Sequence, residues 1–73
     1  MAYEKLFTYI DYIAGEYQRC VNKNNGQEHI YLDCLLNYGE TVLTTAKFAS
    51  QRAYWKNTIK RINPAFAEGY FKN

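Results

Sequence analysis

The chain has 73 residues and a formal net charge of +2 at pH 7, a length that fits one domain, residues 1–73, and excludes a second. Apolar residues make up 48% of the chain, which is typical of a globular protein and argues against disorder. No apolar run approaches the roughly 20 residues that cross a bilayer, so a soluble protein without a membrane partner is expected.

The first expected element covers residues 2–23. Its apolar side chains recur at alternating spacings of three and four residues, and at 100° per residue they fall within an arc of about 140°. They are Tyr3, Leu6, Phe7, Ile10, Ile13, Ala14, Tyr17, Cys20 and Val21. This pattern predicts an amphipathic helix with one face on a core, and Gly15 falls on its opposite, polar side.

A turn signal, Asn24-Asn25-Gly26, ends this pattern with residues that tolerate a positive φ. Two interpretations of residues 17–35 follow. In one, the turn caps the first helix and residues 27–38 form a second helix. In the other, the Asn-Gly pair closes a β-hairpin. The helical pattern on both sides of the turn favours the two helices.

From Glu40 to Ile62 the pattern is helical again, with Gly39 as a weak joint that need not interrupt the helix before it. Asn63-Pro64 then matches an N-cap followed by proline at the first helical position. This pair predicts a terminal turn, residues 64–71, that lays aromatic side chains on the bundle. The expected fold is all-α: a small helical hairpin or three-helix bundle with a short C-terminal helical turn.

The only tryptophan marks the core side of the segment before Ile62. On a helical wheel, four apolar residues fall within about 60° and predict a core stripe. They are Phe48, Trp55, Ile59 and Ile62. Beside this stripe, three cations at i, i+4 spacing predict a basic ridge on the helix. Their aliphatic side-chain stems can cover apolar surface while the charged groups stay in solvent. The three cations are Arg52, Lys56 and Lys60.

Another face of the same segment combines cations with a tyrosine. It carries Lys47, Tyr54, Thr58 and Arg61. Such a face can contact phosphates and stack one base, so nucleic-acid binding by the basic C-terminal helix is the alternative function. A helix-turn-helix over residues 43–62 is not expected, because the three- or four-residue turn that sets its helices at a steep angle is missing.

Charge is unevenly distributed. Residues 1–40 carry three basic and six acidic side chains, whereas residues 41–73 carry six basic and one acidic. Three explanations compete: attraction between the helices of one fold, head-to-tail self-association, and a basic face for an acidic partner. The first is preferred because it needs no partner.

No motif predicts catalysis, a cofactor or a metal. Cys20 and Cys34 lack CxxC spacing, and with His29 they would give three zinc ligands, to which Glu28 or Asp33 would have to be added. We expect both thiols to be core residues in a reducing, cytoplasmic compartment, because the chain opens without an apolar secretory segment. The carboxylates do not pair at helical spacing, so a non-enzyme is expected.

Tyrosines that lie off the core stripe indicate protein binding, since exposed aromatic residues are enriched at interfaces. We expect a small regulator or inhibitor that covers the surface of another protein, a kind of chain that phages and mobile elements encode. The small core also suggests a homodimer. The expected partner-binding residues are Tyr9, Tyr12, Arg52, Tyr54, Lys56, Lys60 and Arg61.

Overall fold

The structure, a computed structural model, describes the backbone of residues 2–72 and the side chains of residues 8–72. Four α-helices and one 3₁₀ turn follow one another in this part of the chain. They are α1 (Ala2–Lys23), α2 (Glu28–Thr41), η1 (Ala46–Phe48), α3 (Ala49–Ile62) and α4 (Pro64–Tyr70). No strand occurs in residues 2–72, so the all-α prediction is confirmed.

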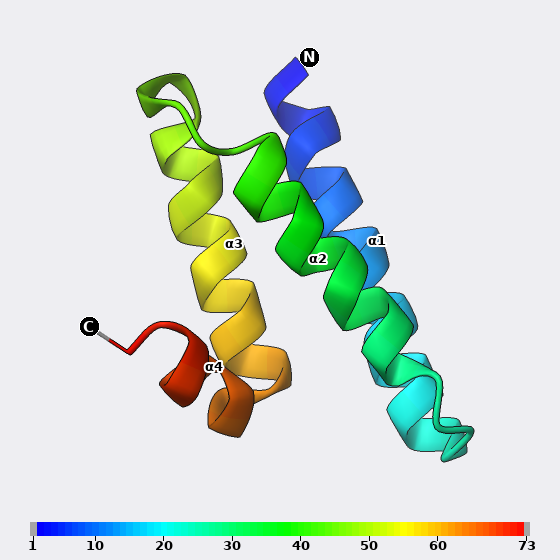
Figure 1. Ribbon diagram of the computed structural model, residues 1–73. Coiled ribbons are helices and arrows are strands. Elements are labelled where there is room, and N and C mark those ends of the chain that lie inside the picture. Colours follow the sequence, from blue (N-terminus) through cyan, green and yellow to red (C-terminus); the bar gives the residue numbers. More distant parts are fainter. Residues whose placement is uncertain (1, 73) are drawn as a thin grey trace.

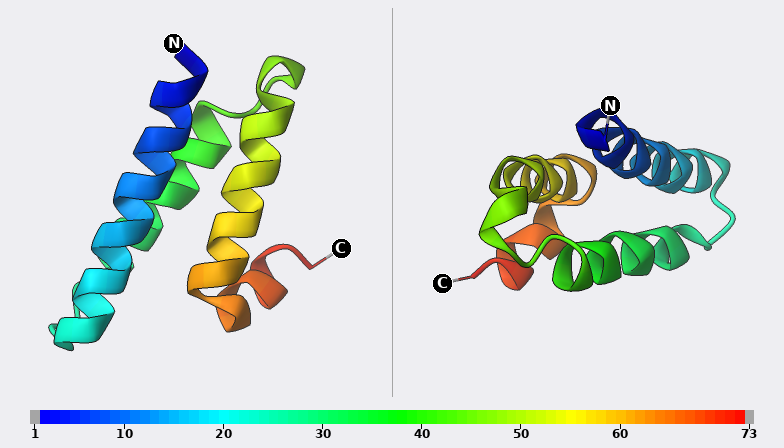
Figure 2. Two further views of the ribbon diagram at one scale, coloured as in Figure 1. Left: turned by 180° about the vertical axis from the view of Figure 1, so that it is seen from behind. Right: turned by 90° about the horizontal axis from the view of Figure 1, so that it is seen from above.

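The helices form two thin layers. α1 and α2 make an antiparallel hairpin, and α3 lies beside α1 and runs in the same direction (Figure 1). Seen from above, α1 and α3 share one layer, while α2 and α4 lie in the other (Figure 2). The molecule measures 37 × 32 × 17 Å, as expected for two layers of helices about 10 Å thick with little depth beyond them.

The core lies where α1, α2 and α3 meet. Its buried side chains are Ile10, Ile13, Leu35, Leu43, Trp55, Ile59 and Ala67. The stripe expected on α3 is confirmed, with Trp55 and Ile59 buried and with Phe48 and Ile62 half-buried against the same cluster. None of the described helices is both long and apolar enough to cross a bilayer.

Trp55 connects α3 to two other helices. Its Nε1 donates a 2.7 Å hydrogen bond to the carbonyl of Leu35 in α2. Its ring meets the edge of Phe71, just after α4, with the ring centroids 5.6 Å apart. Gly39 makes room for this ring, because a Cβ at that position would lie 2.1 Å from two indole carbons. The glycine therefore sets how closely α2 and α3 approach.

The helix predicted from Glu40 to Ile62, with Gly39 as its joint, is wrong. α2 continues through Gly39 to Thr41, and the chain is irregular before η1 begins at Ala46. Leu43 lies in this irregular segment and is completely buried. Burial of Leu43 draws the chain across the top of the core, so a separate α3 starts only at Ala49.

The turn between α1 and α2 has the backbone expected from its residues. Asn24 and Gly26 adopt positive φ values of 55° and 76°. The Asn25 side chain accepts a 3.0 Å hydrogen bond from the backbone N–H of Gln27, and α2 begins one residue later. Residues 17–35 contain no strand, so the β-hairpin interpretation is wrong.

Asn63 and Pro64 start α4 as predicted. The Asn63 side chain accepts a 3.1 Å hydrogen bond from the N–H of Phe66, and Pro64 occupies the first helical position. The same amide donates a 3.0 Å hydrogen bond to the hydroxyl of Tyr17. The cap thus connects the start of α4 to α1, and it lets Phe66 and Phe71 pack on the core.

Candidate functional site

The seven predicted partner-binding residues do not form one surface. Tyr9 packs against Tyr38 of α2 and Tyr12 lies near Tyr31 of α2, whereas Tyr54 and Arg61 face α1 from α3. The three other cations are spread along α3, and they differ in exposure. Arg52 is half-buried, whereas Lys56 and Lys60 are exposed.

The first of these regions is the tyrosine surface, made of Tyr9, Tyr12, Tyr31 and Tyr38 from α1 and α2. Tyr12 is 60% exposed and Tyr9 is 39% exposed, although both are large aromatic residues. The ring of Tyr9 lies against that of Tyr38, with the centroids 4.6 Å apart at an angle of 44°. Tyr31 and Tyr38 are half-buried between the helices. Tyr12 lies close enough to Tyr31 for the two hydroxyls to interact electrostatically, so the surface consists of two tyrosine pairs across α1 and α2 with two exposed rings.

The pKa values of two tyrosines on this surface are raised, so the Tyr31 and Tyr38 hydroxyls stay protonated at neutral pH. Burial raises the pKa of Tyr31, and the nearby Glu16 carboxylate raises it further. Burial also raises the pKa of Tyr38, with an additional contribution from Tyr9. Glu16 itself pairs with Arg19 at 2.8 Å. The tyrosine surface therefore offers mainly uncharged aromatic area, and the Tyr38 hydroxyl within it is buried.

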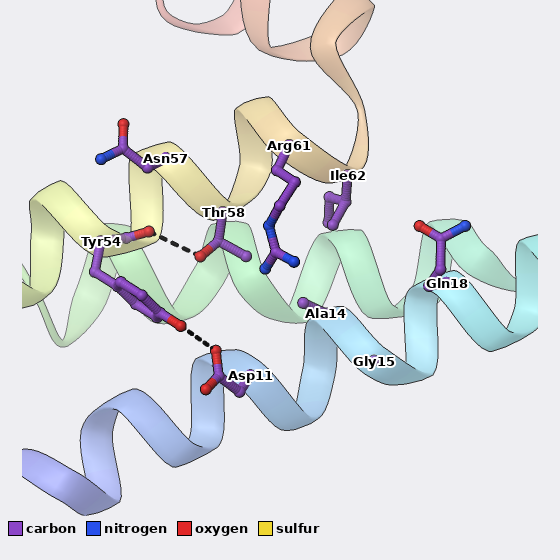
Figure 3. A pocket seen from close by; sticks show the side chains of 9 residues that line it. All are labelled: Asp11, Ala14, Gly15, Gln18, Tyr54, Asn57, Thr58, Arg61 and Ile62. Atoms are coloured by element: carbon purple, nitrogen blue, oxygen red, sulfur yellow. Dashed lines mark hydrogen bonds between the residues drawn. The ribbon is translucent and has the colours of Figure 1, made fainter.

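The second region is an open cleft of about 580 Å³ between α1 and α3. It is lined by Asp11, Ala14, Gly15, Gln18, Tyr54, Asn57, Thr58, Arg61 and Ile62. Ala14 and Gly15 have short side chains and leave space on the α1 side of the cleft, and Figure 3 shows Tyr54, Thr58 and Arg61 extending from α3 toward α1. Sequence reasoning missed this cleft because it required knowing that α3 packs alongside α1.

A hydrogen bond between Tyr54 and Asp11 crosses the cleft. The Tyr54 hydroxyl donates to the Asp11 carboxylate, and the Thr58 hydroxyl donates to the Tyr54 carbonyl at 2.8 Å (Figure 3). The bond to Asp11, together with partial burial and the negative charge of Asp11, raises the pKa of Tyr54, while Arg61 lowers it. Tyr54 was expected to be an exposed anchor, but its hydroxyl joins α3 to α1.

The phosphate-contacting face predicted on α3 is not assembled. Lys47 lies in η1 with its Nζ 5.6 Å from the ring centroid of Phe48, and it does not line the cleft. Thr58 is only 2% exposed. Asp11 places a carboxylate opposite Arg61 and would repel a phosphate there. Of the expected four residues, Tyr54 and Arg61 remain in the cleft with side chains that reach solvent.

Arg52 has a structural role that its place in a charge run did not predict. Its Nε donates to the carbonyl of Leu43, and its Nη2 donates to the carbonyl of Thr45 at 3.0 Å. These carbonyls belong to the irregular segment before η1, which has no helical partners for them. Arg52 therefore holds the α2–α3 connection and is not a free steering charge.

Among the described residues, no three histidine, cysteine, aspartate or glutamate side chains converge on a position for a metal ion. Cys20 is buried, Cys34 is half-buried, and both are free thiols. His29 is exposed, with its Nδ1 3.1 Å from the carbonyl oxygen of Gly26. Comparison with known proteins found no matching family model, curated protein or solved structure.

Proposed function

We propose that this protein is a non-enzymatic binding module that covers part of the surface of another protein through the tyrosine surface. The observation that carries the proposal is the exposure of Tyr12, 60% of which faces solvent beside the 39% exposed Tyr9. Tyrosine is enriched in the central contacts of protein interfaces, where its ring supplies area and its hydroxyl supplies a hydrogen bond.

The binding mode is steric and needs little rearrangement. Tyr9 is already held against Tyr38, and both helices that carry the surface are fixed by the core. Rigid aromatic side chains lose little conformational entropy on binding, so more of their contact energy contributes to affinity. A partner with an apolar groove and carbonyl or carboxylate acceptors at its rim matches this surface.

The chemistry of the cleft supports a non-enzymatic function. A general acid or base must be placed against a substrate in a partly dry site. Here the one carboxylate, Asp11, accepts a hydrogen bond from Tyr54, and the cleft is open to solvent.

Nucleic-acid binding stays the second candidate because Lys56 and Lys60 are exposed and Lys56 Nζ lies 5.8 Å from the ring centroid of Phe71. Two free lysines beside one ring make a small footprint, since Arg52 is engaged and Asp11 opposes Arg61. We therefore expect labelled DNA and RNA to show no tight binding at physiological salt in an anisotropy titration. Tight binding with a steep salt dependence would promote this candidate.

The proposal is tested with a partner isolated from the cells that make the protein, by comparing the dissociation constants of wild type, Tyr12→Ala and Asn57→Ala. Asn57 lines the cleft on α3 and serves as the matched control. A central interface tyrosine contributes about 2 kcal/mol or more, so Tyr12→Ala should bind roughly 30-fold more weakly while Asn57→Ala binds normally. Wild-type affinity in Tyr12→Ala would reject the assignment.

A further inference from the structure

The cleft between α1 and α3 contains two opposite charges that do not pair. Asp11 belongs to the acidic half of the chain and Arg61 to the basic half, and they line the cleft from opposite walls (Figure 3). Among the described side chains, the ion pair that forms is the one between Arg19 and Glu16 within α1, so Asp11 and Arg61 form none. The uneven charge of the sequence therefore places a separated anion and cation in one open space.

From this arrangement we propose that the cleft binds a small zwitterion of the amino-acid class, with its carboxylate on Arg61 and its ammonium group on Asp11. A guanidinium group binds a carboxylate through two parallel N–H···O hydrogen bonds, and a carboxylate accepts hydrogen bonds from an ammonium group. The cleft shares no residue with the tyrosine surface, so this inference does not rest on the proposed function.

The two charges select for a ligand that carries both signs. An anion on Arg61 would be repelled by the Asp11 carboxylate, and a cation on Asp11 would be repelled by Arg61. Salt screens such repulsion only weakly across a small cleft, because the screening length is about 8 Å at physiological salt. A zwitterion meets an opposite charge at each end, so neither repulsion arises.

The Asp11 carboxylate is held in place for this contact. One of its oxygens accepts the hydrogen bond from the Tyr54 hydroxyl, which fixes the side chain across the cleft. An ionised carboxylate can accept about four hydrogen bonds, so acceptor positions remain for an ammonium group. The Thr58 hydroxyl donates to the Tyr54 carbonyl at 2.8 Å and does not compete for the carboxylate.

The α1 side of the cleft has room for the carbon chain of such a ligand. Ala14 is only 5% exposed, and no atom lies within 4 Å of a Cβ built on Gly15. Ile62, which is half-buried, adds apolar surface from α3. Because exposed ion pairs contribute little individually, we expect a dissociation constant on the order of millimolar that increases with salt.

NMR titrations that follow the backbone amides at neutral pH and low salt test the proposal. The probes are glycine, γ-aminobutyrate and ε-aminocaproate, which carry both charges at increasing separation, and butyrate and butylamine, which carry one charge each. At least one zwitterion should shift the amide signals of Gly15 and Arg61 and bind about tenfold more tightly than either singly charged probe. No shift at these positions from any zwitterion, or equally tight binding of butyrate, would overturn the proposal.

Two substitutions test the role of each charge. Asp11→Asn keeps an acceptor for the Tyr54 hydroxyl but removes the negative charge, so the zwitterion should bind about tenfold more weakly. Butyrate should bind this variant more tightly than it binds wild type, because the repulsion near Arg61 is gone. Arg61→Gln should likewise weaken zwitterion binding while it strengthens butylamine binding. Wild-type affinities for all probes in both variants would contradict the assignment.

A third substitution fills the cleft and leaves both charges in place. Gly15→Leu puts a side chain into the open space on α1, and Gly69→Leu is the matched control, because Gly69 is also helical, has nothing within 4 Å of its Cβ position and does not line the cleft. Zwitterion binding should be lost in Gly15→Leu and normal in Gly69→Leu. The amide spectra establish that each variant is folded, and if Gly15→Leu is not, Asp11→Asn decides. Normal binding by a folded Gly15→Leu would place the ligand outside the cleft and refute the proposal.

Discussion

The indole ring of Trp55 occupies the space that a side chain at Gly39 would fill. A Cβ on Gly39 would lie 2.1 Å from two ring carbons, closer than any real Cβ contact. The ring is held there by its hydrogen bond to Leu35 and by the edge of Phe71. The glycine is inside α2, where its own helix propensity is poor, so the packing of Trp55 explains why a glycine stands there.

Gly39→Ala should therefore destabilise the protein, by about 1–3 kcal/mol, because Trp55 has to move from its site. Gly15→Ala is the matched control, since Gly15 is also inside a helix and has nothing within 4 Å of its Cβ position. That variant should be more stable than wild type by up to about 1 kcal/mol, from helix propensity alone. Urea unfolding followed by circular dichroism gives both values, and a shift of the same sign in the two variants would refute the close packing.

The Tyr38 hydroxyl gives a second prediction, because it is buried and has no hydrogen-bond partner among the described residues. A buried hydroxyl without a partner has lost its water without compensation. Tyr38→Phe should leave stability unchanged or raise it by about 1 kcal/mol, and chemical unfolding measures the difference. A clear loss of stability would mean that the hydroxyl is bonded in solution.

Tyr54 should behave in the opposite way, since its hydroxyl donates to Asp11 across the cleft. We expect Tyr54→Phe to lose about 1 kcal/mol at pH 7, a modest value because the bond is partly exposed. The pKa of Tyr54 is raised above its ordinary value of 10.0 in the folded state. The stability contributed by the protonated hydroxyl is then complete below pH 10 and is lost as the pH rises through the folded-state pKa.

The difference in stability between wild type and Tyr54→Phe should consequently narrow above pH 10. Parallel unfolding curves at pH 7, 9 and 11 test this, and the other tyrosines and lysines are common to both proteins. A difference that is constant across this range would show that the bond to Asp11 does not depend on the Tyr54 proton.

Arg52→Lys separates charge from geometry at the α2–α3 connection. Lysine keeps the positive charge but cannot place two fixed N–H groups on the Leu43 and Thr45 carbonyls together. We expect a loss of about 1–2 kcal/mol, from hydrogen bonds that involve a charged donor. The denaturant midpoint of unfolding is measured for Arg52→Lys and for the control Lys56→Arg, which also keeps the positive charge but changes an exposed residue. Equal midpoints in the two variants would indicate that Arg52 acts only as a surface charge.

Local patterns predicted the helices well, because each rests on residues near one another in sequence. The 3.6-residue periodicity located α1 and the core stripe of α3, and Asn63-Pro64 located the start of α4. The end of α2 was misplaced because glycine normally weakens a helix, and the reason for Gly39 is a contact with Trp55, 16 residues away.

The candidate site was predicted less well, because its contacts also join residues that are far apart in the sequence. Tyr54 has the spacing of an exposed residue, and its bond to Asp11 depends on α3 lying alongside α1. Arg52 belongs to a basic run in the sequence but binds carbonyls of a segment whose irregular backbone the pattern did not reveal. Tyr9 and Tyr12 were correctly predicted to lie off the core, because the helical periodicity of α1 alone shows which of its residues face away from the apolar stripe.

The central claim is that the tyrosine surface contacts a protein partner, and site-specific cross-linking tests it most directly. A photoreactive phenylalanine analogue replaces Tyr12 in one version of the protein and Asn57, in the cleft, in another. We predict one discrete cross-linked protein from position 12, displaced by excess unmodified protein and retained at moderate salt, and none from position 57. Equal cross-linking from both positions, or none from position 12, would contradict the account.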